Sequence, residues 1–77
     1  MAILTVKVID KTTKAPLPWV HVELDGMVQT TSADGVVHFD VPEGTYTLKV
    51  RTLEYQPYTG RVTVPGSVTV ELIRARF

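Results

Sequence analysis

Seven short stretches of this chain alternate apolar with polar residues, and turn-forming residues separate them. In the first stretch, Leu4, Val6 and Val8 alternate with polar residues. A period of two places apolar side chains on one face of a β-strand and polar side chains on the other. The stretches that we expect to form strands are 3–10, 19–24, 27–31, 37–41, 45–51, 62–64 and 68–72. The pattern therefore predicts an all-β protein.

The turn signals between these stretches are specific. Asp25-Gly26 predicts a two-residue hairpin, because both residues tolerate positive φ. Further turns are expected at 32–35, 42–44 and 65–66, where Gly, Pro, Ser and Asp gather. The inward alternation breaks after Val50, so we expect the fifth strand to end at 51–52 and an aromatic-rich loop to follow at 53–60.

Seven short strands with regular turns predict a single antiparallel sandwich or barrel spanning 1–77. A chain of 77 residues is close to the lower size limit for folding on its own core, which excludes a second domain. Each strand offers one inward row. The residues expected in the core are Leu4, Val6, Val8, Val20, Val22, Leu24, Val37, Phe39, Val41, Tyr46, Leu48, Val50, Val62, Val64, Val68, Val70 and Leu72.

Charge and composition exclude several classes of function. Eight basic residues balance eight acidic ones, so the chain has no electrostatic footprint for nucleic acid. It has no cysteine, hence no disulfide and no thiolate zinc site. The longest apolar run covers residues 1–4, which is too short for a signal peptide or for membrane insertion.

The order of several motifs resembles a known family. A first strand ending in Asp10 is followed by Pro16-Leu17-Pro18, by a Thr-Ser-Ala-Asp-Gly turn at 31–35 and by Val-Pro-Glu-Gly-Thr-Tyr-Thr-Leu at 41–48. This resembles the carboxypeptidase regulatory-like domain family over nearly the whole chain. The resemblance implies a prealbumin-like (transthyretin-like) β-sandwich with Ig-like Greek-key topology, related to collagen-adhesin B-type domains. It also implies a non-catalytic accessory module of secreted or cell-surface proteins. Where the family usually has a Gly before the aromatic residue that precedes its last two strands, this chain has Glu54 before Tyr55.

Two related families that carry out a chemical reaction do not match these residues. Collagen-adhesin B-type domains join Lys to Asn in an isopeptide bond, but this chain has no Asn, and Val50 stands where that family has its catalytic Glu. Lys7 is therefore expected to be a solvated strand lysine. The transthyretin-like hydroxyisourate hydrolases end in Tyr-Arg-Gly-Ser, whereas this chain ends in Ala-Arg-Phe.

Other polar residues point to no catalytic residue, metal or cofactor. The alternation places His21 and His38 on the outward faces of their strands. Together with Glu23 they could form a surface site, but zinc needs three or four ligands. Ser32 and Ser67 are expected in turns with no histidine beside them. Asp25 and Asp34 stand in isolated Asp-Gly turns rather than in a dense acidic calcium loop.

Trp19, Tyr55 and Tyr58 are the candidate binding residues, because exposed aromatic side chains offer a flat apolar face to a partner. We expect a non-catalytic structural or protein-interaction module. Its partner would be another protein, a neighbouring domain of the same chain or a second copy paired through a sheet edge. The alternative is a carbohydrate-binding accessory module, which would present Trp19 and a tyrosine as one exposed platform for a glycan. A small hydrolase would need a polar pocket.

Overall fold

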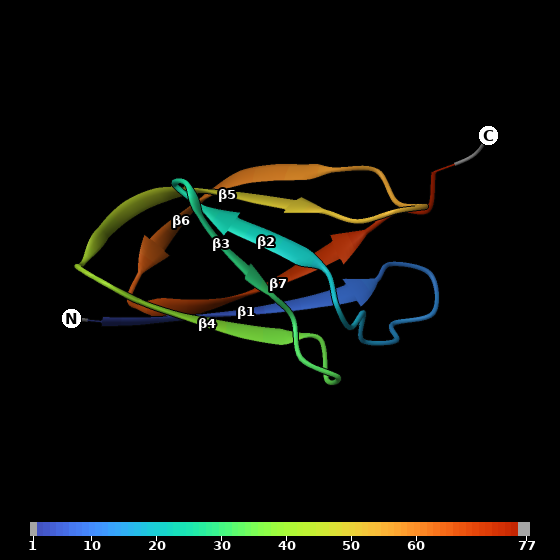
Figure 1. Ribbon diagram of the computed structural model, residues 1–77, viewed down its shortest axis with the longest axis horizontal. Helices are drawn as coiled ribbons and strands as arrows, with labels where there is room; N and C mark the ends of the chain where they lie inside the picture. Colours follow the sequence, from blue (N-terminus) through green and yellow to red (C-terminus); the bar gives the residue numbers. More distant parts are fainter. Residues whose placement is uncertain (1, 76–77) are drawn as a thin grey trace.

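The computed structural model describes residues 2–75, which form two β-sheets packed face to face (Figure 1). The strands are β1 (Ala2–Asp10), β2 (His21–Leu24), β3 (Met27–Thr30), β4 (Val36–Val41), β5 (Gly44–Arg51), β6 (Tyr58–Val64) and β7 (Gly66–Leu72). The strand order is β4-β1-β7 in sheet A and β3-β2-β5-β6 in sheet B. The described residues include no helix long and apolar enough to span a membrane. The predicted seven-stranded β-sandwich is confirmed.

One strand pair runs in the direction opposite to our expectation. Every other pairing is antiparallel, but β1 and β7 are parallel, with Leu4 beside Gly66 and Asp10 beside Leu72. The expectation of a purely antiparallel sandwich is wrong for this pair. Turn residues fix the direction only of strands that they join. The first and last strands share no turn, so the sequence pattern does not encode their relative direction.

Three strands begin two or more residues away from the expected position. β2 begins at His21, because Trp19 takes a left-handed conformation with φ 61° and its N–H donates to the Thr31 carbonyl (3.1 Å). β6 begins at Tyr58, which pairs with Val50 and so extends the pairing along β5 from Gly44 to Val50. β7 begins at Gly66, which places Ser67 in a strand rather than in a turn.

The core between the sheets contains the predicted residues with two exceptions. Tyr46 and Val68 are half-buried and pack against the core from its margin. The Tyr46 hydroxyl donates to the Pro42 carbonyl (2.6 Å) at the corner where the chain passes from sheet A to sheet B. A tyrosine suits this position because its ring can pack on the core while its hydroxyl reaches a polar partner. Phe39 is the largest fully buried side chain.

The β2–β3 hairpin extends beyond the layer that sheet A covers. Its turn has the predicted geometry, with φ 46° at Asp25 and 91° at Gly26. The Asp25 carboxylate accepts a bond from the Thr47 N–H (2.9 Å), which ties the start of the turn to β5. All four residues of β3 are exposed, and β3 contains no charged residue. β3 is therefore an open edge strand that is held by β2 alone.

A close crossing of three segments joins the two sheets. Val8 N–H donates to the Gly35 carbonyl (2.8 Å), and Leu17 N–H donates to the Val8 carbonyl (2.9 Å). The buried Thr31 hydroxyl accepts a bond from Val20 N–H (2.9 Å) and donates to the Leu17 carbonyl (2.8 Å). These bonds satisfy backbone groups that would otherwise be buried without partners.

Gly35 occupies a position in this crossing where no other amino acid fits without strain. Its φ is 73°, and a Cβ at this position would lie 2.8 Å from the Val8 carbonyl oxygen and 3.0 Å from the Leu17 nitrogen. Both neighbours are backbone atoms held in the crossing itself. A side chain here would therefore combine backbone strain with a clash that has no flexible partner to relieve it.

We expect Gly35→Ala to lower the free energy of unfolding by about 2–3 kcal/mol or more, because strain and clash add. Gly26→Ala is the matched control, since Gly26 has φ 91° with nothing within 4 Å of its Cβ position. It should lose about 1 kcal/mol through backbone strain alone. Urea unfolding curves measure both values, and equal losses for the two variants would contradict the proposed clash.

Candidate functional site

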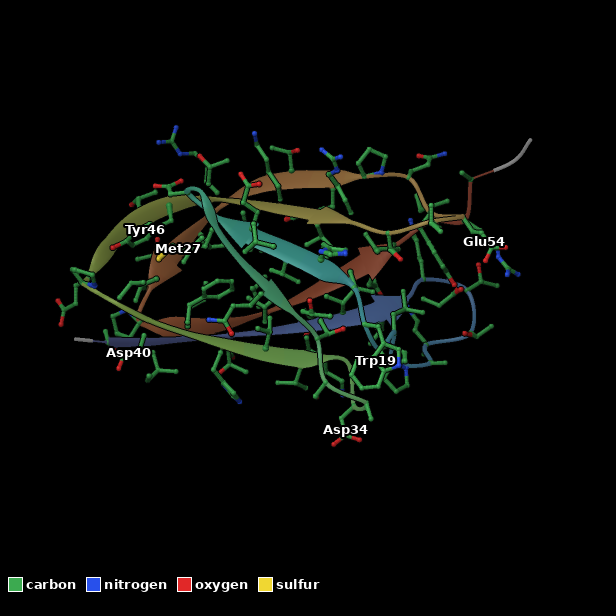
Figure 2. All side chains as sticks on the ribbon, in the orientation of Figure 1. Trp19, Met27, Asp34, Asp40, Tyr46 and Glu54 are labelled. Carbon is green, nitrogen blue, oxygen red and sulfur yellow. The ribbon has the colours of Figure 1, made fainter. Side chains whose placement is uncertain are left out.

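Two exposed apolar side chains lie beside one end of sheet B. Trp19, in the turn before β2, has 68% of its surface exposed, and Leu53, just after β5, has 87% exposed. His21 pairs with Arg51 in the sheet, so the start of β2 and the end of β5 lie together. Figure 2 shows Trp19 and Glu54 in the same half of the molecule. Such side chains cost free energy in water and suit a surface that another molecule covers.

A shallow groove runs from this end over the outer face of sheet B. Its volume is about 560 Å³, and Val28 on β3 and Leu53 provide its apolar walls. Its polar lining includes His21, Glu23, Lys49 and Arg51. The alternation of β2 and β5 sends these polar side chains outward, while Val22 and Val50 between them are fully buried.

The groove has an excess of positive charge. Lys49 lies opposite Glu23 in the β2–β5 register, whereas Arg51 lies opposite His21 and has no carboxylate across from it. The ion pairs among the described residues are Lys14–Glu71 and Arg74–Glu54, and neither involves the groove. Its apolar walls and unpaired cations therefore favour a partner that presents carboxylates next to an apolar side chain.

A second polar cluster joins Asp10, the last residue of β1, to Tyr55. The Asp10 carboxylate is buried, with 7% of the residue exposed, and it accepts bonds from the Thr12 and Thr13 N–H groups (2.7 and 3.1 Å). Its other oxygen accepts a bond from the Tyr55 hydroxyl (2.6 Å). The Arg74 guanidinium lies 6.0 Å from the centre of the Tyr55 ring. This cluster fastens the 54–56 loop to β1.

The cluster shifts two pKa values in opposite directions. The Tyr55 hydroxyl, followed by the Thr13 and Thr12 N–H groups, lowers the pKa of Asp10, and these bonds outweigh the effect of burial. The same hydrogen bond raises the pKa of Tyr55, since it favours the neutral phenol beside the carboxylate. Across the surface, Lys14 lowers the pKa of Glu71. The Asp10–Tyr55 bond is thus strongest when the carboxylate is charged and the phenol is neutral.

The three candidate aromatic residues have different environments. Trp19 is exposed, whereas Tyr55 and Tyr58 are half-buried and pack against the core. The Tyr58 ring lies across Gly60, where it occupies the space that a side chain would need. The structure brings Tyr55 to Asp10 and Tyr58 to the core edge. Trp19 is the one of the three that is largely free to contact a partner.

The two histidines lie on different sheets. His21 lines the groove on sheet B, while His38 lies on β4 in sheet A, where its Nδ1 is 3.0 Å from the Thr5 hydroxyl. The shared surface site that their parity allowed does not form. Within residues 2–75, no three His, Asp or Glu side chains are grouped to hold a metal ion. Ser32 lies in its predicted turn, where its hydroxyl accepts a bond from Asp34 N–H (3.3 Å).

Sequence reasoning did not identify Val28, Leu53 or the Asp10–Tyr55 bond. Asp10 did carry a signal, because it occupies the next inward position after Leu4, Val6 and Val8, where a carboxylate requires polar partners. Leu53 follows the break in alternation, which marks a change of direction but not exposure. Val28 is exposed because it pairs with the outward-facing Glu23 across the β2–β3 hairpin, so it lies on the outer face of sheet B.

Comparison with known proteins gives one family and one instructive structure. The family model described as carboxypeptidase regulatory-like domain matches residues 3–75. Among solved structures, the group B streptococcus pilus 2b backbone protein is similar, with a TM-score of 0.69 and 21% sequence identity. The match covers 95% of this chain and 41% of that chain, so this chain spans less than half the length of that protein. No curated protein matches the sequence.

We expect Tyr55→Phe to destabilise the protein at neutral pH, since it leaves the buried Asp10 carboxylate with one donor fewer. The folded-state pKa of Asp10 is lowered, so its contribution is complete above the unfolded pKa and is lost as pH falls through the folded value. The difference between wild type and variant should therefore shrink below about pH 4. Urea unfolding at several pH values measures it.

Tyr46→Phe is the matched control for this experiment. It also removes one tyrosine hydrogen bond, but its acceptor is the uncharged Pro42 carbonyl. Its loss of stability should stay constant across the same acid range. A Tyr55→Phe difference that is equally constant with pH would show that the Asp10 bond is not linked to protonation.

Proposed function

Because the chain belongs to the carboxypeptidase regulatory-like domain family, we propose that it is a non-catalytic structural module that joins and spaces its neighbours in a larger, cell-surface assembly. The observation that carries this proposal is the position of its ends. The sandwich measures 39 × 21 × 17 Å, and β1 begins at one end of the long axis while the chain leaves β7 at the other (Figure 1). A module with this geometry adds its full length to any chain that contains it.

The similar solved structure supports an assembly role. Its name describes a pilus backbone protein. At 21% identity the likeness concerns the fold, and the role comes to this chain as part of our proposal. A repeated assembly needs surfaces of different kinds at the two ends of each unit, since head-to-tail contacts generate open chains.

We place the docking contact of this module at Trp19, Leu53 and the groove on sheet B. The partner is a protein surface that presents carboxylates beside an apolar side chain. The opposite end of the same molecule offers such a surface, because Asp25, Asp40 and Glu43 are exposed there. Figure 2 shows Asp40 at the end of the sandwich far from Trp19. A second copy therefore serves as the probe of this contact.

The carbohydrate-binding alternative has less support. A sugar platform needs at least two coplanar exposed aromatic rings, but Tyr55 donates its hydroxyl to Asp10 and Tyr58 packs over Gly60. Trp19 remains available by itself, and one exposed indole suits a protein partner as well as a glycan. The cationic groove beside it favours the protein, because neutral glycans gain nothing from Lys49 and Arg51.

We expect the chain to self-associate in a concentration-dependent way, and Leu53→Ser to weaken that association without changing stability, because Leu53 is exposed. Sedimentation velocity measures the association. Trp19 is the single tryptophan, so a blue shift of its emission on association reports burial of this end directly. Added salt should weaken the contact because charges take part in it.

Thr69→Ala is the matched control. Thr69 is exposed on β7 in sheet A, opposite Lys7 in the register and away from both proposed contact surfaces. Self-association should be unchanged in this variant. A chain that stays monomeric at every accessible concentration, or that associates equally well with Ser at position 53, would refute docking through this surface.

A further inference from the structure

We propose that the parallel β1–β7 pair is a mechanical clamp that allows this module to carry tension along its long axis. The proposal rests on the proposed function, since a spacer in an assembly is pulled by the neighbours at its two ends. All seven residues of β7 pair in parallel with residues 4–10 of β1. The first and last strands of the module are therefore bonded directly to each other.

The direction of these strands decides how a pulling force acts on them. Tension at the start of the module draws β1 toward its N-terminus, and tension at the other end draws β7 toward its C-terminus. The two strands point the same way, so the forces on them are opposite and parallel to the ladder. Its evenly spaced hydrogen bonds are then loaded together in shear. An antiparallel hairpin pulled at its two free ends instead opens one bond at a time.

The position of β1 resists sliding. β1 is the central strand of sheet A and also pairs with β4 from Ala2 to Lys7. Leu4, Val6 and Val8 are 0–1% exposed in the core. A slip of one residue would turn this apolar row toward water and the polar row inward, so the strand cannot move in small steps. Sliding must break both ladders and the core contacts together.

Further contacts fasten the far end of the clamp. Lys11 N–H donates to the Leu72 carbonyl (3.0 Å), and Lys14 forms an ion pair with Glu71. Beyond β7, Gln56 N–H donates to the Ile73 carbonyl, and Ala75 N–H donates to the Glu54 carbonyl, both at 2.8 Å. The segment that leaves β7 is thus held against sheet B before the load reaches the ladder.

This clamp is held by non-covalent contacts, namely hydrogen bonds, packing and the Lys14–Glu71 ion pair. The chain has no cysteine and no asparagine, and Lys7 lies opposite Thr69 in the register. The module should therefore yield at a finite force, extend, and refold when the force is removed. Such behaviour would absorb a sudden load.

The test uses two double-cysteine variants that share one attachment point. Ile3→Cys with Ile73→Cys attaches handles at opposite ends of the clamp and loads it in shear. Lys11→Cys with Ile73→Cys attaches handles at the same end and peels the same ladder open from Asp10 and Leu72. All three positions are exposed, and the chain has no native cysteine that would compete for the handles. Single-molecule force spectroscopy then measures the unfolding force in each direction.

We expect the unfolding force to be severalfold higher in shear than in peeling, because forced unfolding follows the barrier along the pulling direction. Urea unfolding of both variants before handle attachment should give equal stability, so that the difference in force reflects geometry. A Glu71→Gln change in the shear variant should lower the force, because it removes the ion pair with Lys14.

Equal forces in the two directions would overturn the clamp. That result would leave the proposed function standing if copies still associate through Leu53 and Trp19. A high shear force in a chain whose copies never associate would support the clamp and refute the docking surface. The two measurements therefore fail independently.

Discussion

The dry layer between the two sheets determines where every other feature of this protein lies. A chain of 77 residues can close only one core, and each strand except β3 contributes a single row of side chains to it. Once Leu4, Phe39 and Leu48 are buried in that layer, the residues that alternate with them must face water. The strand residues that line the groove are of this kind. Its chemistry is the outward half of a pattern whose inward half holds the fold together.

The core and the local turns could be predicted from the sequence because both depend on short-range patterns. The inward row of β1 follows from the spacing of Leu4, Val6 and Val8, and the turn at Asp25-Gly26 follows from two residues that accept positive φ. The parallel direction of β7 could not be predicted, since it depends on how the whole chain winds between the sheets.

The site was predicted less well than the fold, for a physical reason. Parity shows which way a residue points within a strand, but Trp19, Leu53 and Tyr55 lie outside the strands. An aromatic residue in a loop can cover the core or face a partner, and the residue type alone does not decide which of the two it does. Tyr55 packs inward because the buried Asp10 carboxylate needs its hydroxyl. Trp19 has a left-handed backbone conformation and precedes the first residue of β2, so its side chain stays outside the sheet and exposed.

The β2–β3 hairpin has a consequence for protein engineering. Asp25 is tied to Thr47, but nothing lies within 4 Å of the Cβ position of Gly26, and β3 is held by β2 alone. New sequence placed between Gly26 and Met27 would emerge into solvent without touching the packed layer, and exposed loop tips of this kind tolerate grafts. The fold thus offers a display scaffold on which foreign loops can be carried.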